Sequence, residues 1–146
     1  MSNEMHKVYL GLGSNLGNRE EIIREAIRLI GERVGTVVSQ SSLIETEPWG
    51  FESEHTFLNG VILVETTLTP HEVLAATQQT ERDLGKNSSH ATKRRLLATY
   101  KDRPIDIDIL LYDDLRVNDP DLKIPHPLMH ERPFVMQPLH EIMKEP

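Results

Sequence analysis

The chain contains no cysteine, so disulfide bonds and cysteine metal sites are excluded, and a reducing compartment such as the cytoplasm is expected. No apolar run approaches the roughly 20 residues that a membrane-spanning helix needs, and the first residues lack the apolar core of a signal peptide. Aromatic residues make up only 5% of the chain. The length of 146 residues suits one domain, residues 1–146, around one core. We therefore expect a single-domain cytoplasmic protein without membrane contact.

Basic residues are also in the minority, and a net charge of −7 argues against general nucleic-acid binding. They are concentrated in residues 86–103, which hold six basic side chains and one acid and so carry +5, while the rest of the chain carries −12. This distribution indicates binding of a small polyanion, and the length of the segment is typical of a lid. The alternative is an ordinary solvated loop rich in lysine and arginine.

The apolar spacing predicts the element order βαββαβ. Asn18 with Glu21, and Thr69 with Glu72, have the spacing of helix capping boxes. We expect strands at 8–13, 36–45, 57–68 and 104–112, and helices at 18–33 and 69–85. Two helices on one face of a mostly antiparallel sheet form the ferredoxin-like α+β fold. The proline-rich tail is expected to be mostly irregular, with room for one short helix.

Two aspartates, Asp106 and Asp108, alternate with isoleucines in the run Ile105–Ile109. Because side chains alternate faces in a strand, both carboxylates are expected on one face, with Cα atoms about 6.6 Å apart. That spacing allows them to share hard cations such as Mg²⁺. An Asp-x-Asp pair alone more often faces solvent. Here the basic segment ends at Arg103, three residues before Asp106, and this combination favours a phosphate site.

Three other features have ordinary structural explanations when taken alone. Gly11–Gly17 fits neither a Walker loop nor a dinucleotide fingerprint, so a tight turn that requires positive φ is favoured. Gln78 and Glu81 share one helix face and are typical surface residues. His126, between two prolines, could bind phosphate, but a lone histidine is more often structural.

The few aromatic residues lie at loop and strand ends. Phe57 opens a predicted strand beside Asn59, Trp49 lies in a glycine-containing loop, and Phe134 lies in the tail. Two aromatic rings could clamp a flat heterocycle while Asn59 binds its edge. A core position for Phe57 and Phe134 is the alternative, and the side chains alone favour it.

Several of these segments together match one family. They are Gly13-Ser14-Asn15-Leu16-Gly17, Phe57-Leu58-Asn59, Arg103-Pro104-Ile105-Asp106-Ile107-Asp108-Ile109 and Pro125-His126-Pro127. From about Val8 to Ile142 the sequence resembles the 6-hydroxymethyl-7,8-dihydropterin pyrophosphokinases of folate biosynthesis. The resemblance implies a ferredoxin-like fold and transfer of the β,γ-diphosphate of ATP to the pterin hydroxymethyl group, with release of AMP.

The resemblance also implies residue roles. It implies two Mg²⁺ ions held by Asp106 and Asp108. Further catalytic cations would be Arg103 and Lys86. ATP contacts would come from Gln78, Glu81, Tyr100, Arg103, Ile109, His126 and Arg132. The pterin pocket would comprise Thr46, Pro48, Trp49, Phe57, Asn59 and Phe134, with the two phenylalanines stacking on the pterin and Asn59 binding its amide edge.

This sequence departs from the family pattern at two places. The first is the basic loop, where Tyr100 stands at a position that is often tryptophan in the family. Lys86 is therefore assigned to the β-phosphate only by its position after Gly85. The chain ends at Pro146, sooner than many relatives. A monomer is expected, with a homodimer as the alternative. Two other functions stay open: a ligand-binding or regulatory module without catalysis, and a different Mg²⁺-dependent phosphotransferase.

Overall fold

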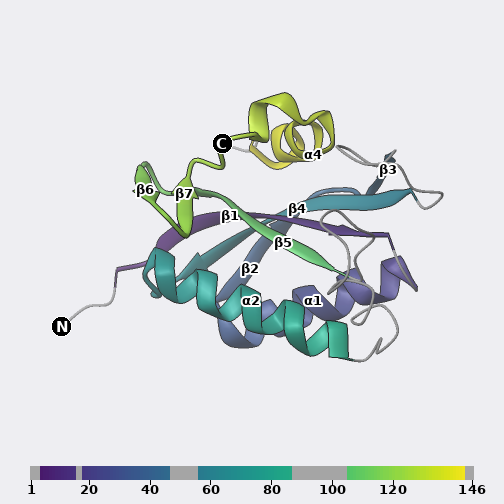
Figure 1. Ribbon diagram of the computed structural model, residues 1–146, viewed down its shortest axis with the longest axis horizontal. Helices are drawn as coiled ribbons and strands as arrows, with labels where there is room; N and C mark the ends of the chain where they lie inside the picture. Colours follow the sequence, from purple (N-terminus) through teal and green to yellow (C-terminus); the bar gives the residue numbers. More distant parts are fainter. Residues whose placement is uncertain (1–3, 16–17, 47–55, 87–104, 144–146) are drawn as a thin grey trace.

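The computed structural model describes residues 4–15, 18–46, 56–86 and 105–143 (Figure 1). Its elements are β1 (His6–Ser14), α1 (Arg19–Arg33), β2 (Thr36–Gln40), β3 (Ile44–Thr46), β4 (Phe57–Thr66), α2 (Pro70–Lys86), β5 (Asp106–Tyr112), β6 (Val117–Asp119), β7 (Leu122–Ile124), a 3₁₀ turn (Met129–Glu131) and α4 (Pro133–Met143). They form three layers, with α1 and α2 on one face of the main sheet and α4 on the other (Figure 1).

The main sheet has the strand order β2-β4-β1-β5, and β3 also pairs with β4. All strand pairings among the described residues are antiparallel, so the predicted ferredoxin-like arrangement is confirmed. The single strand predicted at 36–45 is divided into β2 and β3. Ser41 explains the division, because its hydroxyl accepts a hydrogen bond from Val61 N at 2.9 Å, where a continuous ladder would use a backbone carbonyl.

The predicted capping box of α2 is complete, and at α1 the predicted cap residue Asn18 caps the helix through its side chain. Glu21 N donates to the Asn18 side chain at 3.2 Å. Thr69 N donates to Glu72 at 2.8 Å, and Glu72 N donates back to the Thr69 hydroxyl at 3.2 Å. The helix α2 continues one residue beyond Gly85, the predicted stop. Within the described ranges, no helix is long and apolar enough to cross a membrane.

The sheet has a hydrophobic cluster on each face. The cluster under α1 and α2 includes Val8, Leu10, Ile23, Ile30, Val64, Val73, Ile107 and Ile109. The cluster under α4 consists of Val61, Leu110, Met129, Val135, Leu139 and Ile142. Because side chains of each strand alternate between these clusters, the sequence position of a strand residue determines which layer it faces.

The prediction of a mostly irregular tail was wrong. Residues 113–143 contain the β6–β7 hairpin, a 3₁₀ turn and α4, which has 11 residues. Pro133 occupies the first helical position, where the missing N–H costs nothing. Val135, Leu139 and Ile142 repeat at helical spacing and are buried, so tertiary packing stabilises α4 in spite of Pro138 within it.

Candidate active site

The two aspartates of β5 lie on the face of the sheet opposite α1 and α2. Ile107 and Ile109 are 6% and 5% exposed and pack in the cluster under those helices, whereas Asp106 and Asp108 are partly exposed. The predicted alternation of carboxylates and isoleucines is therefore confirmed. Both carboxylates face the side of the sheet that α4 covers.

A bulge in β5 lies just after this pair. Tyr9 pairs with Leu111 and Leu10 pairs with Ile109, so Leu110 is the additional residue. Leu110 packs under α4 while its neighbour Ile109 packs under α1 and α2. The Leu110 carbonyl accepts a hydrogen bond from His126 N at 3.0 Å. The bulge thus attaches the Pro-His-Pro segment to the strand that carries the aspartates.

A row of three residues crosses the sheet at this end. Gly13 of β1 pairs with Asn59 of β4 on one side and with Asp106 of β5 on the other. Neighbouring strands lie about 4.8 Å apart, so Asn59 and Asp106 are separated by roughly 10 Å across a residue without a side chain. Gly13 therefore adds no side chain to the strip of sheet between a carboxamide and a carboxylate on the same face, and Asn59 Oδ1 and Phe57 border this strip.

Space above Gly13 is limited. A Cβ atom at Gly13 would lie 2.8 Å from Asn59 Oδ1 and 3.5 Å from Phe57 Cδ1. Gly11 and Gly13 are strand residues of β1, and neither has the positive φ of the turn favoured by the sequence, so that interpretation was wrong for both. The strand predicted at 8–13 includes both glycines and is confirmed within β1, and their alternation with leucine, Leu10-Gly11-Leu12-Gly13, is the two-residue period of a strand.

Asn59 is 5% exposed and oriented by Thr46. Its Nδ2 donates to Thr46 Oγ1 at 2.6 Å, which leaves Oδ1 directed at the space above Gly13. Phe57, at the start of β4, borders the same space. Three residues of the predicted pterin pocket, Thr46, Phe57 and Asn59, are therefore adjacent, and together they offer a ring face and a fixed acceptor.

Arg19, which the sequence analysis did not identify, contacts both Glu45 and Thr56, two described residues on either side of segment 47–55. Its Nη1 donates to Thr56 O and to Thr56 Oγ1 at 3.0 Å each, and its Nη2 lies 2.9 Å from Glu45 Oε2. Hydrogen bonds from Thr56 and Arg19 lower the pKa of the Glu45 carboxyl, with the Arg19 charge adding to the effect.

On the metal side, Arg132 connects two predicted site residues. Its Nη1 lies 3.9 Å from Asp108 Oδ2, and its guanidinium carbon lies 5.7 Å from the centroid of the Phe134 ring. Phe134 also packs against the cluster under α4. The 3₁₀ turn and α4 therefore bring a cation and an aromatic ring to the aspartate face.

His126 lies in the same electrostatic environment. Burial lowers the pKa of its imidazole, the positive charge of Arg132 lowers it further, and the charge of Asp106 opposes this shift. Leu128 N donates to His126 Nδ1 at 3.2 Å, which leaves Nε2 as the protonated nitrogen of the neutral ring. His126 is thus placed as a neutral hydrogen-bond donor near the carboxylates.

Glu81 and Gln78 have different environments on α2. Glu81 Oε2 accepts a hydrogen bond from Ile107 N at 2.7 Å, so its carboxylate contacts the backbone between the two aspartates. Gln78 is exposed. Their spacing on one helix face predicted two surface residues. In the structure, the side chain of Glu81 instead supports the backbone of β5. Their roles in binding ATP stay predictions.

For most of the other predicted site residues, the side chain lies outside the part of the chain that the structure describes. Pro48, Trp49, Tyr100 and Arg103 lie outside the described residues, as does most of the predicted lid, and Lys86 is described only as the last residue of α2. The Ile109 side chain is in the core on the opposite face from the aspartates. Ile109 could therefore contact a nucleotide only through its backbone.

The donor set at the two aspartates suits a hard divalent cation. Both are carboxylates on one strand face, and the side chain of Asp108 is 32% exposed, so phosphate and water could complete the coordination. Arg132 Nη1, at 3.9 Å from Asp108, is beyond hydrogen-bond length. The arrangement can hold a cation beside a phosphate. On the other side of the Gly13 strip, Phe57 and Asn59 can bind a flat heterocycle that accepts the transferred group.

Comparisons of the sequence identify the family of the chain. A family model for 7,8-dihydro-6-hydroxymethylpterin-pyrophosphokinase (HPPK) matches residues 9–144. The 2-amino-4-hydroxy-6-hydroxymethyldihydropteridine pyrophosphokinase of Porphyromonas gingivalis is 46% identical over 136 residues, which cover 92% of this chain and 89% of the relative. The Bacillus subtilis protein of the same name is 38% identical over 138 residues, covering 94% and 78%.

Solved structures support the fold. An HPPK-DHPS in complex with substrates has a TM-score of 0.71 and 16% identity, covering 96% of this chain and 40% of its own. A Plasmodium falciparum HPPK-DHPS triple mutant has a TM-score of 0.73 and 15% identity, covering 97% of this chain and 40% of its own. This chain thus spans about two fifths of those longer chains. By its sequence and its fold, the chain belongs to the 7,8-dihydro-6-hydroxymethylpterin-pyrophosphokinase family.

Proposed function

We propose that the face around Asp106, Gly13 and Asn59 transfers the β,γ-diphosphate of ATP to the hydroxymethyl group of 6-hydroxymethyl-7,8-dihydropterin and releases AMP. Membership of the family makes the chain a pterin pyrophosphokinase of folate biosynthesis. The observation that supports the residue assignment is the row Asn59–Gly13–Asp106, because the Asn59 amide and the two carboxylates lie on one face of the sheet.

The acceptor side binds the pterin. Asn59 Oδ1, held by the hydrogen bond to Thr46, accepts from the amide or amino edge of the heterocycle. Phe57 and Phe134 provide aromatic surface from β4 and α4. The hydroxymethyl group then extends along the strip over Gly13 toward the aspartates. Orienting this oxygen lowers the entropic part of the barrier.

The phosphate side binds ATP. Asp106 and Asp108 would hold Mg²⁺, two ions by the family resemblance, which would bind phosphate oxygens and offset their charge. Arg132 adds a permanent positive charge beside Asp108, and His126 donates a hydrogen bond from Nε2. Arg103, Lys86 and the other basic residues of 86–103 would add positive charge from the loop.

The reaction is an in-line displacement. The hydroxymethyl oxygen attacks the β-phosphorus, the bond between this phosphorus and the oxygen bridging to the α-phosphorus breaks, and AMP leaves with that oxygen. The hydroxyl proton passes to solvent. The residues of this chain contribute orientation and charge compensation, so removal of either aspartate should affect turnover much more than folding.

Asp106→Asn and Asp108→Asn test this proposal. Each variant should lower AMP production from ATP and the pterin by at least about 100-fold, since the metal loses a charged ligand. Asp114→Asn, in an exposed turn, is the matched control and should keep wild-type turnover. The assay measures AMP and pterin diphosphate with and without the pterin, and circular dichroism checks folding. Wild-type rates in both site variants would exclude Asp106 and Asp108 as metal ligands.

The same assay separates the alternatives. ADP as product would indicate a different phosphotransferase, and pterin binding without any product would indicate a non-catalytic module. AMP that appears only with the pterin supports the proposed transfer. A cytoplasmic location and a monomeric state, with a homodimer as the alternative, stay predictions that fractionation and size-exclusion chromatography can test.

A further inference from the structure

A second group of potential metal ligands lies at the other end of the sheet from the candidate active site. His71 is in the first turn of α2, and Asp119 and Asp121 belong to the β6–β7 hairpin. Asp119 pairs with Leu122, so Pro120 and Asp121 form a two-residue turn. Figure 1 shows this hairpin beside the start of α2. The three side chains therefore meet from two elements that are distant in sequence.

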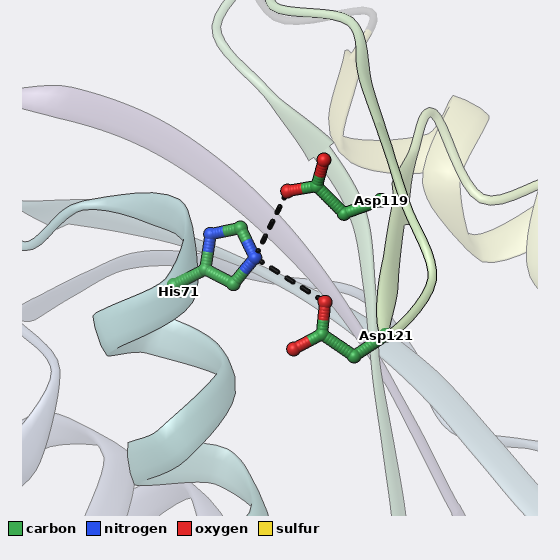
Figure 2. A group of neighbouring side chains, drawn as sticks. All are labelled: His71, Asp119 and Asp121. Carbon is green, nitrogen blue, oxygen red and sulfur yellow. Dashed lines mark ion pairs between the residues drawn. The ribbon is translucent and has the colours of Figure 1, made fainter.

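Their ligand atoms converge on one point. His71 Nε2 lies 3.2 Å from Asp119 Oδ2 and 3.4 Å from Asp121 Oδ1, and all three ligand atoms lie within 4.8 Å of one another. Figure 2 shows the imidazole edge directed between the two carboxylates. Each residue offers one atom to a common position, and the three atoms define one face of a coordination shell.

These distances suit a bound cation better than a strong ion pair. A charge-assisted N–H···O bond is about 2.7–2.9 Å long, and one Nε2–H cannot point at two carboxylates at once. Ligands about 2.0–2.1 Å from a tetrahedral Zn²⁺ are separated by roughly 3.3 Å, the edge of the tetrahedron. The two distances from His71 Nε2, 3.2 and 3.4 Å, match that edge, and the two aspartate oxygens lie within 4.8 Å of each other.

The ligand types select the class of cation. Two carboxylates beside one imidazole carry excess negative charge, which a divalent cation neutralises. Mg²⁺ and Ca²⁺ prefer sites made only of oxygen, whereas an imidazole favours Zn²⁺, Co²⁺ or Ni²⁺. His71 and Asp119 are each 48% exposed, and Asp121 is 65% exposed, so water can occupy the remaining coordination position.

One cation of the protein lies close to this cluster. The Lys123 ammonium donates to Asn118 Oδ1 at 2.8 Å and to the Asp119 backbone carbonyl at 3.2 Å. These bonds direct Lys123 to the backbone and amide groups of the hairpin. The imidazole of His71 is thus the basic group that faces both carboxylates in Figure 2.

We infer that His71, Asp119 and Asp121 form a binding site for a divalent transition-metal cation of the Zn²⁺ class, separate from the Asp106–Asp108 pair. The bound cation joins the start of α2 to the β6–β7 hairpin. The hairpin leads through Ile124 directly to His126, so the cation also restrains the segment that reaches the candidate active site. The inference is independent of the proposed pyrophosphokinase reaction.

Calorimetric titration of the full chain with ZnCl₂ tests the site, with His71→Ala and Asp121→Asn as variants and His130→Ala as the control. His130 is exposed and lies outside the cluster. We expect micromolar binding at one site that weakens at least about tenfold in both variants and is unchanged in the control. The same site should persist in Asp106→Asn, which separates it from the aspartates of β5.

Two further measurements test the ligands and the location of the site independently of calorimetry. Co²⁺ added to the wild-type chain should give visible absorption bands of a nitrogen–oxygen site, and they should disappear with His71→Ala. In nuclear magnetic resonance spectra, Zn²⁺ should shift amide signals of residues 71–73, 117–119 and 121–123. Shifts confined to residues 105–109, binding only at millimolar Zn²⁺, or unchanged affinity for Zn²⁺ in both variants would overturn the inference.

Discussion

At the scale of single residues, the candidate site depends on a side chain that is absent. Gly13 separates Asn59 from Asp106 in one row of the sheet, and any larger residue would occupy the strip between them. If Asn59 moved away from such a residue, its buried amide would lose the hydrogen bond to Thr46. The absence of a side chain at Gly13 therefore gives Asn59 Oδ1 and Phe57 room beside the strip that separates them from the metal side.

Gly13→Ala should weaken pterin binding by about tenfold, equivalent to ~1.4 kcal/mol. The new Cβ would lie 2.8 Å from Asn59 Oδ1, so the amide must rotate away from the ligand or lose its bond to Thr46. ATP affinity should change much less. Calorimetry with each ligand separately measures both effects.

Gly11→Ala is the matched control for this substitution. It lies two residues earlier on the same face of β1, and its Cβ would meet Leu110 at 3.5 Å, an ordinary contact distance. Pterin affinity should therefore stay near the wild-type value. Equal losses in the two variants would mean that β1 responds to any added methyl group, and the strip over Gly13 would have no special role.

At the scale of elements, α2 supports the strand that carries the aspartates. Among the described residues β5 is at the edge of the main sheet, so one side of its backbone has no neighbouring strand there. Glu81 of α2 accepts the Ile107 N–H on that side, at the residue between Asp106 and Asp108. This hydrogen bond fixes the backbone from which both carboxylates project.

Glu81→Ala should lower the free energy of unfolding by about 1–3 kcal/mol, because the Ile107 N–H loses its acceptor. Glu81→Gln keeps an acceptor oxygen and should lose less. Gln78→Ala, at an exposed position on the same helix, should stay within about 0.5 kcal/mol of wild type. Urea unfolding measures all three. A stable Glu81→Ala variant with normal AMP production would show that this contact does not support β5.

The elements differ in how well the sequence predicted them, and the differences have physical causes. The cap at Asn18 of α1, the capping box of α2 and the alternation in β5 depend on local spacing, so they could be predicted from the sequence. Helix α4 depends on burial of Val135, Leu139 and Ile142 against the far face of the sheet, a long-range contact that proline counting does not reveal.

The site followed the same rule. The aspartate pair was predicted from one strand, whereas the opposition of Asn59 and Asp106 across Gly13 requires the pairing register of three strands. The contact of Glu81 with Ile107 joins residues 26 positions apart, and nothing in their spacing indicates it. The family resemblance supplied roles for these residues, but the register explains why they are close.

At the scale of the whole molecule, α4 and the segment before it form a third layer. Side chains of this layer lie beside the aspartates of the candidate site. The α4 cluster buries Leu139 and Val135 at one part of the sheet face, and Phe134 and Arg132 extend from the same segment to the aspartates. His126 is joined to the bulge at Leu110. Stability of this layer and occupancy of the site should therefore change together.

The pH dependence of folding tests this connection through His126. Burial and the Arg132 charge lower the pKa of its imidazole in the folded state, so the folded protein binds fewer protons than the unfolded chain just below the ordinary histidine value of 6.5. Stability from the neutral imidazole is thus complete above pH 6.5. It is lost as the pH falls through the folded-state pKa.

We expect the free energy of unfolding, measured with urea in metal-free protein, to decrease more steeply below pH 6.5 in wild type than in His126→Gln. The variant keeps a polar side chain but has no proton to gain, so the difference between the two curves isolates His126 from the other histidines. Ring resonances of His126 should titrate with a midpoint below 6.5. A midpoint above that value would mean that the attraction of Asp106 outweighs burial and Arg132, which would reverse the predicted slope and leave His126 positively charged at the site.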